Sequence, residues 1–329
     1  MNSLAQRQIS ELAPFRIAPR FVARVWGFHD LRPWYDHVAG QDPVGEVWLT
    51  GDECLVDSGI HTGKALGTLF VEQAESLLGS EAARSASPLL LKVIFAKDKL
   101  SVQVHPDDRL AQKYGQPSGK TECWYALAAD PGARVACGLK PGVTLEKIEE
   151  GIQAGTLEES LNVLDVAAGD MIFVDAGTVH AIWPGSILLE TQQNCDLTYR
   201  LYDYGRPREL HVEKSLEATR LSTRAGKIAP KALQDRTILV DVEYFRVERL
   251  ATAGNRTSAS LKGQDQKPGL AYLFAAAGSA RITGAAFDTV DLPARGIVAV
   301  PASSPDFTVE DAGGLDLIRM TPNWPVAAA

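Results

Sequence analysis

The chain has 329 residues, of which 45% are hydrophobic and 22% are charged, and its formal net charge at pH 7 is −8. This composition is ordinary for a soluble globular protein, and the length allows two domains or one large one. An acidic chain is a poor partner for nucleic acid or an anionic membrane, so an anionic ligand has to be met by a few local cations.

The sequence has no membrane or export signal that we can identify. No apolar run approaches the roughly 20 residues that span a bilayer, and the N-terminal stretch MNSLAQRQISELAPF has no continuous apolar core of a signal peptide. The four cysteines (Cys54, Cys123, Cys137 and Cys195) form no CxxC pair. We therefore expect a cytoplasmic protein with reduced thiols, and we expect Cys123 to pack in the core.

The first 235 residues mix strand-like and helical patterns. Alternating or apolar runs predict strands at 21–27, 43–55, 89–95, 124–129, 133–139 and 165–204. Helical spacing predicts helices over 62–86, 143–164 and 209–225, with Thr144 as the N-cap of the second. We assign residues 1–235 to one domain that carries these helices.

The pattern changes from Thr237 onward. Short strand-like runs such as ILVDVEYFRVERLA, LAYLFAAAG and GIVAVP each end at Gly, Pro or Asp, which is typical of an all-β sandwich or jelly roll. No histidine follows His211. Residues 236–329 are therefore expected to form a β domain that has no histidine metal site of its own.

A polar strand face lies within the stretch LSVQVHPDDRLAQKYGQPSGKTECWY (100–125). Ser101, Gln103 and His105 alternate with aliphatic residues, so a strand places these three side chains on one face. Glu122 follows after a loop rich in Gly, Pro and Ser, and His180 closes a later strand. Taken alone, the polar face could line a pocket or could face solvent.

Two imidazoles, a carboxylate and an amide suit a borderline divalent metal ion such as Zn²⁺. The set consists of Gln103, His105, Glu122 and His180, and Gln is the least common ligand among them. A lysine, Lys92, interrupts the apolar run LLLKVIF just before this strand. Its ammonium needs a partner or a wet cavity if it is buried, and the alternative is that it reaches solvent at a sheet edge.

Several motifs resemble a known family. The run GDMIFVDAGTVHAI resembles the second cupin motif, although Asp175 stands where cupins usually have proline. In chain order, the sequence contains LLLKVIFAKDKLSVQVHPDD, GKTECWYAL, GTVHAI and ETQQNCDLTYRLYDYGRPREL. Together these runs resemble the short bacterial form of the type I mannose-6-phosphate isomerases, and the resemblance extends back to FVARVWG at 21–27.

The resemblance implies a mainly β fold with two cupin-type β-barrels or jelly rolls, of which only the first binds metal. It implies one Zn²⁺ per chain and interconversion of mannose 6-phosphate and fructose 6-phosphate through a cis-enediol. The partner would be a small sugar phosphate, with no nucleic acid or membrane, in a monomer or homodimer. By similarity the zinc ligands are Gln103, His105, Glu122 and His180, the catalytic residues Arg200, Lys92 and Glu190, and the substrate-binding residues Ser101, Lys120, Glu46 and Trp26.

Three questions are left open by the sequence. The catalytic base is not identified, since Glu190, Lys92 and a metal-bound water are all candidates. Arg200 could instead form an ion pair with Asp203 or Glu190. A non-catalytic phosphosugar-binding cupin and an iron-dependent cupin oxygenase are the alternative functions.

Overall fold

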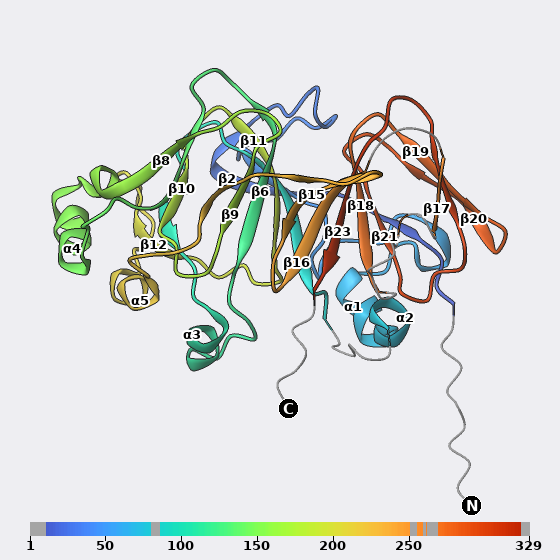
Figure 1. Ribbon diagram of the computed structural model, residues 1–329, viewed down its shortest axis with the longest axis horizontal. Helices are drawn as coiled ribbons and strands as arrows, with labels where there is room; N and C mark the ends of the chain where they lie inside the picture. Colours follow the sequence, from blue (N-terminus) through green and yellow to red (C-terminus); the bar gives the residue numbers. More distant parts are fainter. Residues whose placement is uncertain (1–10, 80–85, 251–254, 259–260, 262–268, 324–329) are drawn as a thin grey trace, which may run out of the picture. The chain divides into compact units, whose positions relative to one another are not determined.

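The structure is a computed structural model that describes residues 11–79, 86–250, 255–258, 261 and 269–323. The chain is mainly β, as predicted, and it divides into two compact units (Figure 1). Residues 20–48 and 88–231 form what we call the central unit. Residues 1–19, 49–87 and 232–329 form the terminal unit. Among the described residues, no helix is long and apolar enough to cross a membrane.

The central unit contains two antiparallel sheets rather than one closed barrel. The larger sheet has the strand order β13 (Gly226–Ile228), β9 (Met171–Val174), β6 (Glu122–Ala129), β11 (Ser186–Gln193), β4 (Leu89–Phe95), β3 (Val44–Trp48) and β2 (Arg20–Phe28). The smaller sheet has the order β12 (Tyr199–Tyr202), β5 (Val102–Val104), β10 (His180–Ile182), β7 (Arg134–Leu139) and β8 (Leu161–Asp165).

The main core of this unit lies between its two sheets. Trp124 and Ile172 from the larger sheet pack in one cluster with Val135 and Ile182 from the smaller sheet. A second cluster joins the other face of the smaller sheet, through Val104 and neighbouring residues, to helix α4 (Leu145–Ala154) and helix α5 (Val212–Ala218). One face of the smaller sheet is thus covered by helices, while its other face points toward the larger sheet.

The predicted helix over 143–164 is too long. Thr144 caps α4 as expected, and its side chain accepts a hydrogen bond from the Lys147 N–H. The helix ends at Gly155, whose φ of 72° lies in the left-handed region that favours glycine. A 3₁₀ turn, η2 (Leu157–Ser160), follows, and residues 161–165 form strand β8. The helix predicted over 209–225 is likewise limited to α5.

The terminal unit is also built from two sheets, which confirms the strand-rich character predicted beyond Thr237. Its larger sheet has the order β1 (Phe15–Ile17), β21 (Ile297–Val300), β18 (Ala271–Ala277), β23 (Asp316–Pro322), β16 (Phe245–Leu250), β15 (Arg236–Asp241) and β14 (Lys231–Ala232). Its smaller sheet has the order β17 (Arg256–Thr257), β22 (Thr308–Asp311), β19 (Ala280–Gly284) and β20 (Phe287–Leu292). An apolar cluster that includes Leu273, Ile282 and Val309 draws on both sheets.

The two units are not the contiguous segments 1–235 and 236–329. Strand β1 belongs to the terminal unit because it pairs with β21, Phe15 facing Ala299. The predicted helical stretch 62–86 also belongs there, as two short helices, α1 (Leu66–Glu72) and α2 (Ala74–Leu78), within the described part of that stretch. Long-range pairing of this kind leaves no local pattern in the sequence.

A buried group of charges crosses the larger sheet of the terminal unit. Glu248 on β16 pairs with Arg319 on β23, and the Arg319 Nε donates to Glu248 Oε2 over 2.8 Å. Arg236 Nη1 lies 3.7 Å from the other oxygen, Glu248 Oε1. All three side chains are buried, so each charge depends on its partners for stabilisation.

Candidate metal centre and its pocket

Cross-strand register brings three of the predicted site residues into one row of the smaller sheet. His180 on β10 lies opposite Gln103 on β5, and Gln103 lies opposite Arg200 on β12. Side chains that face each other across antiparallel strands point to the same side of a sheet. The alternation of apolar and polar residues within β5 therefore has the predicted consequence, since Val102 and Val104 pack in the helix-covered core on the opposite face. Leu100, which the alternation predicts on the same face as the two valines, packs instead in the core between the sheets, because β5 begins only at Val102.

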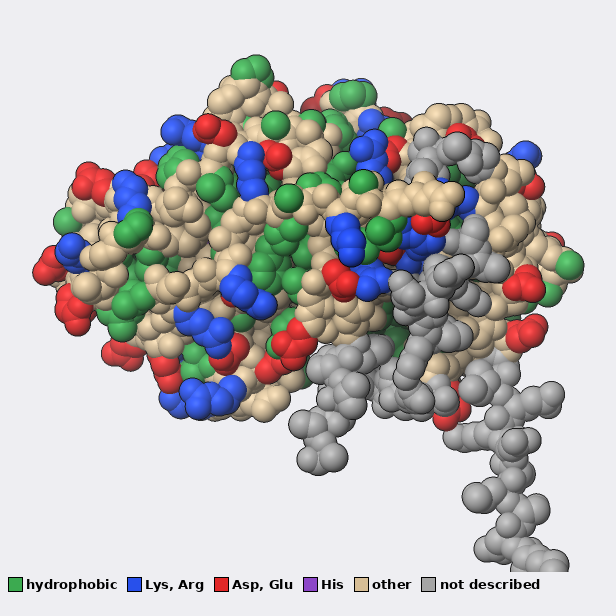
Figure 2. Space-filling model, viewed as in Figure 1, with side chains coloured by type: hydrophobic (Ala, Val, Ile, Leu, Met, Phe, Trp, Pro, Cys, Tyr) green, Lys and Arg blue, Asp and Glu red, His purple; other side chains and the backbone are tan. Residues whose placement is uncertain are grey.

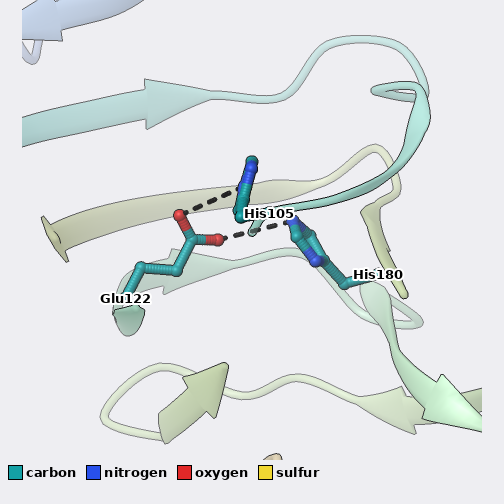
Figure 3. A group of neighbouring side chains, drawn as sticks. All are labelled: His105, Glu122 and His180. Carbon is teal, nitrogen blue, oxygen red and sulfur yellow. Dashed lines mark ion pairs between the residues drawn. The ribbon is translucent and has the colours of Figure 1, made fainter. Parts of the chain in front are cut away.

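His105, Glu122 and His180 converge from three different segments. Glu122 Oε2 lies 3.6 Å from His105 Nε2, and Glu122 Oε1 lies 3.5 Å from His180 Nε2 (Figure 3). One potential ligand atom from each of the three residues lies within 4.8 Å of the other two. All three side chains are buried. In the part of the chain that the structure describes, this is the one group of at least three His, Cys, Asp or Glu residues that could hold a metal.

The two imidazole rings are fixed from behind by backbone carbonyls. The Nδ1 atom of His105 lies 2.9 Å from the Leu197 carbonyl oxygen, and that of His180 lies 2.8 Å from the Thr178 carbonyl oxygen. A carbonyl can only accept, so each Nδ1 carries the proton and each Nε2 presents a lone pair. Burial also lowers the pKa of His180 to about 4 and that of His105 well below its usual value. Both rings are therefore neutral, as metal ligation requires.

The buried acceptors of this group are short of hydrogen-bond donors. His105 Nε2 and Glu122 Oε1 are buried without a hydrogen-bond partner, whereas Glu122 Oε2 has the Lys120 ammonium 3.0 Å away. Leaving buried acceptors unsatisfied is costly, and a divalent cation would satisfy both unpartnered atoms at once. Gln103 Nε2 lies 3.1 Å from His180 Nε2, so its amide nitrogen, rather than its oxygen, faces the ring in this orientation. The donor set fits a metal ion, with Gln103 as a ligand only if its amide is turned over.

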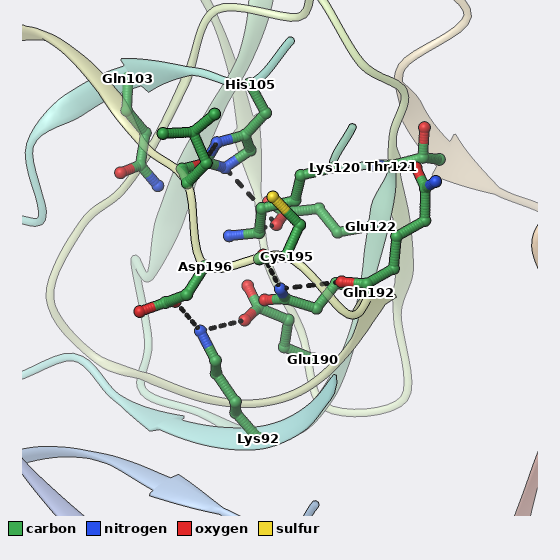
Figure 4. Close-up of polar contacts among 12 residues, drawn as sticks. Lys92, Gln103, His105, Lys120, Thr121, Glu122, Glu190, Gln192, Cys195 and Asp196 are labelled. Carbon is green, nitrogen blue, oxygen red and sulfur yellow. Dashed lines mark hydrogen bonds and ion pairs between the residues drawn. The ribbon is translucent and has the colours of Figure 1, made fainter. Parts of the chain in front are cut away.

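Lys92 is buried among carboxylates. Its Nζ lies 2.7 Å from Asp196 Oδ1 and 3.6 Å from Glu190 Oε2 (Figure 4). It also lies 3.8 Å from Glu46 Oε2. Burial opposes its charge, but Glu46 and Glu190 outweigh burial and raise the pKa of Lys92. Its ammonium is also 5.0 Å from the centre of the Trp48 ring. Lys92 is therefore a permanently charged buried cation, which rules out the solvent-facing lysine at a sheet edge.

Glu46 is held by two neighbours besides Lys92, which donate three hydrogen bonds to it. Arg24 donates to it through Nε over 3.0 Å and through Nη2 over 2.9 Å, and Trp48 Nε1 donates over 2.7 Å. Burial would raise the pKa of Glu46, but Lys92 and Arg24 outweigh it and lower that pKa. Arg24 Nη2 also lies 3.8 Å from Asp196 Oδ2.

Lys120 and Glu190 complete the charged group. Lys120 Nζ lies 3.0 Å from Glu122 Oε2. Burial alone would lower the pKa of Lys120, but the negative charge of Glu122 and its neighbours outweighs burial and raises that pKa. Trp124 Nε1 donates to Glu190 Oε1 over 3.2 Å. Burial raises the pKa of Glu190 to about 6, despite the opposing effect of Lys120. Glu190 is thus a buried carboxyl whose pKa lies close to neutral pH.

Arg200 makes no ion pair in the described part of the chain, so it pairs with neither Asp203 nor Glu190. Its Nη1 donates to the Glu209 carbonyl over 2.8 Å, and its Nε is buried without a partner. Burial and the nearby Arg208 lower the pKa of Arg200. Asp203 instead binds Arg208 through two hydrogen bonds of 2.6 Å.

The remaining predicted site residues, Ser101 and Trp26, are buried, but they do not belong to the charged group. Ser101 is buried just before β5, and no side-chain contact links it to the charged group. Trp26 lies in the apolar cluster between the sheets, where its ring packs over Gly45. Cys123 is buried as expected, and all four cysteines are free.

Two residues of the charged group were missed in the sequence. Asp196 lies in the irregular segment between β11 and β12, and Arg24 lies on strand β2. The motif ETQQNCDLTYRLYDYGRPREL contains Asp196, and Arg24 stands two residues before Trp26 in FVARVWG, so both could have been found as charged residues inside matched motifs.

The charged group carries an excess of negative charge when Glu190 is ionised. Around the two neutral histidines lie the cations Arg24, Lys92 and Lys120, and the carboxylates Glu46, Glu122, Glu190 and Asp196. Four carboxylates against three cations then leave one uncompensated negative charge in the group. This excess favours a bound cation.

Comparison with known proteins shows the family of the chain. The model of the phosphomannose isomerase type I catalytic domain matches residues 15–133. The mannose-6-phosphate isomerase of Streptococcus mutans is 35% identical over 285 residues, which are 82% of this chain and 87% of that protein.

Solved structures have the same fold. The mannose 6-phosphate isomerase from Bacillus subtilis superimposes with a TM-score of 0.82 at 30% identity, covering 94% of this chain and 100% of that one. A mannose 6-phosphate isomerase bound with zinc and yttrium superimposes with a TM-score of 0.73 at 16% identity, over 94% of this chain and 100% of that one. The chain belongs to the type I phosphomannose isomerases, the family of aldose–ketose isomerases also called mannose-6-phosphate isomerases.

Proposed function

We propose that the protein is a zinc-dependent isomerase that interconverts mannose 6-phosphate and fructose 6-phosphate. The observation that carries the metal requirement is the convergence of three buried ligand groups, His105, Glu122 and His180. In this group His105 Nε2 and Glu122 Oε1 have no hydrogen-bond partner, and the Nε2 atom of His180 is deprotonated. The relative with zinc in its structure supports the choice of ion. Zn²⁺ at this position would polarise the substrate oxygens.

The charges of the pocket suit an anionic substrate. A divalent ion would convert the excess of one negative charge into an excess of one positive charge. A sugar phosphate and the negative charge that develops during enolisation would both be favoured by that change. Arg200 is the cation we assign to this developing charge, because its guanidinium has no carboxylate partner in the described structure.

The reaction requires a proton to leave the carbon next to the carbonyl and return to the adjacent carbon, through a cis-enediol. We propose Glu190 as the group that carries this proton. Its pKa of about 6 lets it exist in both forms near neutral pH. Lys92 is unsuited to this role, because the carboxylates around it keep its ammonium charged. Lys92 and Lys120 instead hold the carboxylates of the pocket in place.

The substrate contacts are proposed with different degrees of directness. Lys120 and Glu46 belong to the charged group. Their polar atoms can contact the sugar directly, or they can orient other side chains that contact it. Ser101 is proposed as a contact through its position on the polar side of the β5 alternation. Trp26 is proposed to support the pocket from the core rather than to touch the sugar.

The test measures metal and turnover on the same sample. The protein is expressed in zinc-supplemented medium, its metal content is determined by mass spectrometry, and conversion of mannose 6-phosphate is followed by a coupled assay. We expect bound zinc, loss of activity with a chelator and recovery on adding Zn²⁺. If protein with a full complement of zinc leaves both sugar phosphates unchanged, the proposed activity is wrong. Iron content with oxygen uptake would favour an oxygenase instead.

A further inference from the structure

The segment 194–198, between β11 and β12, connects the charged group with a metal ligand. These residues belong to no strand or helix, so side chains and isolated backbone bonds determine their path. Gln192 Nε2 donates to the Cys195 carbonyl over 2.5 Å, and the Leu197 side chain packs against the helix-covered core. The side chain of the residue between them, Asp196, contacts cationic side chains.

In the middle of this segment Asp196 faces two cations. Lys92 Nζ donates to Asp196 Oδ1 over 2.7 Å, and Arg24 Nη2 lies 3.8 Å from Asp196 Oδ2 (Figure 4). The Lys92 side chain is 2% exposed, whereas that of Asp196 is 45% exposed. The lysine stands on β4, an interior strand of the larger sheet, so it is the fixed member of the pair and the segment is the part that it holds.

One residue further on, the backbone reaches the metal centre. The Leu197 carbonyl accepts the hydrogen bond from His105 Nδ1 over 2.9 Å. This bond selects the tautomer that leaves Nε2 free and sets the angle of the ring. The acceptor is a backbone atom, so the position of the Leu197 carbonyl depends on the path of the backbone between residues 195 and 198.

We infer that Lys92 is a positioning residue for the metal ligand His105, and that it acts through Asp196 and the Leu197 carbonyl. The inference rests on the metal site proposed above. It assigns to a lysine of the substrate pocket an effect on metal affinity that requires no contact between the lysine and the ion.

Electrostatics alone predicts the opposite sign, which makes the inference testable. Replacing Lys92 by a neutral side chain removes a positive charge from the surroundings of the ion. If charge were its only contribution, the substitution would tighten Zn²⁺ binding. If Lys92 positions His105, the same substitution weakens Zn²⁺ binding, because the carbonyl that orients the ring is no longer held in place. Loss of partners that orient metal ligands costs about 10–100-fold in affinity.

The experiment compares Lys92→Met and Lys92→Arg with the unmodified chain. Zn²⁺ affinity is measured by competition with a chromophoric chelator, and the d–d absorption of the Co²⁺-substituted protein reports the ligand geometry. We expect Lys92→Met to weaken Zn²⁺ binding about tenfold and to change the Co²⁺ spectrum. We expect Lys92→Arg, which retains a cation, to restore most of the affinity. A Lys92→Met variant that binds Zn²⁺ as tightly as the unmodified chain, or more tightly, overturns the inference.

A charge-balanced variant covers the case in which Lys92→Met does not fold. The double variant Lys92→Met/Asp196→Asn removes both members of the pair, and circular dichroism verifies its folding. Positioning predicts the same loss of Zn²⁺ affinity as in the single variant, because the pair is already broken. Pure electrostatics predicts a return to the affinity of the unmodified chain, and that result would also overturn the inference.

Two controls separate this inference from the proposed function. Lys99→Met removes another lysine of the central unit, one that pairs with Glu158, and it is expected to leave the Zn²⁺ affinity unchanged. If the unmodified chain binds no Zn²⁺, the proposed metal site is wrong. If it binds Zn²⁺ and both Lys92 variants bind equally well, the metal site stands and the positioning role is wrong.

Discussion

Lys92 and Asp196 are 104 positions apart in the chain, yet the lysine Nζ lies 2.7 Å from the aspartate Oδ1. The contact joins strand β4 to the irregular segment that also supplies the carbonyl partner of His105. Because of it, the charged pocket and the candidate metal centre are parts of one connected arrangement rather than two neighbouring sites.

Replacing either histidine of the candidate centre should remove the metal together with activity. His105→Ala and His180→Ala each delete one of the two Nε2 atoms that face Glu122, which leaves too few protein ligands for a tetrahedral ion. Metal content by mass spectrometry and the coupled assay measure the two losses. Gln103→Ala is a useful comparison, because we expect it to retain more metal than either histidine variant. Full zinc occupancy in His105→Ala would contradict the assignment of this ligand.

Replacing Arg200 should separate turnover from metal binding. Its guanidinium has no carboxylate partner among the described residues, and it shares a sheet face with Gln103 without entering the group of three ligands. We expect Arg200→Ala to lower kcat about 10²–10³-fold, as for other groups that stabilise developing charge. Zinc content should stay unchanged. Loss of the metal in this variant would show that Arg200 supports the centre instead.

The pH dependence of the reaction should report Glu190. Its pKa is raised to about 6 by burial, and it faces the charges of Lys120, Glu122, Lys92 and Glu46. As the base, Glu190 acts in its ionised form, so kcat/KM should fall about tenfold per pH unit as the pH decreases below about 6. The matched variant Glu190→Gln keeps the shape of the side chain and cannot titrate. It should lose most of the activity, and an unchanged acidic limb in this variant would assign the pKa to another group.

The buried charges of the terminal unit lead to a prediction about stability. Glu248→Leu leaves the buried guanidinium of Arg319 without its carboxylate, which should lower the free energy of unfolding by about 3–5 kcal/mol. The double variant Glu248→Leu/Arg319→Met removes both charges and should recover most of that loss. Urea unfolding followed by circular dichroism measures both changes. A double variant as unstable as the single one would mean that the pair is required for more than charge compensation.

Part of the site could be predicted because local periodicity determines it. The alternation around Gln103 and His105 is enough to place both on one face, and register with His180 and Arg200 then brings the row together. Lys92 could be recognised as unusual, since a lone lysine in an apolar run demands a partner. The identity of its partners could not be predicted, because Asp196 lies in an irregular segment whose path depends on tertiary contacts.

The fold was predictable to a similar extent. The strand-rich pattern beyond Thr237 and the cap at Thr144 are local signals, and both predictions are confirmed. The extent of α4 could not be predicted, because Leu161–Asp165 is compatible with either a helix or a strand, and its pairing with β7 decides. The division into units depends on β1 pairing with β21, which no local pattern reveals.

Charged side chains of both signs are mixed on the surface face shown in Figure 2, as expected for a chain with a small net charge. Lys and Arg are interspersed with Asp and Glu over the face seen in Figure 2, rather than gathered in one basic area. On that face, mixed charge offers an anionic ligand no single strongly basic area, in keeping with the net charge of −8.

The pairing of β1 with β21 also constrains the order in which a newly made chain can fold. Residues 20–48 and 88–231, which supply both sheets of the central unit, are synthesised after β1 and before its partner Ile297–Val300. The candidate metal centre can thus be assembled before β21 has been made, whereas the larger sheet of the terminal unit is completed only once β21 has been synthesised.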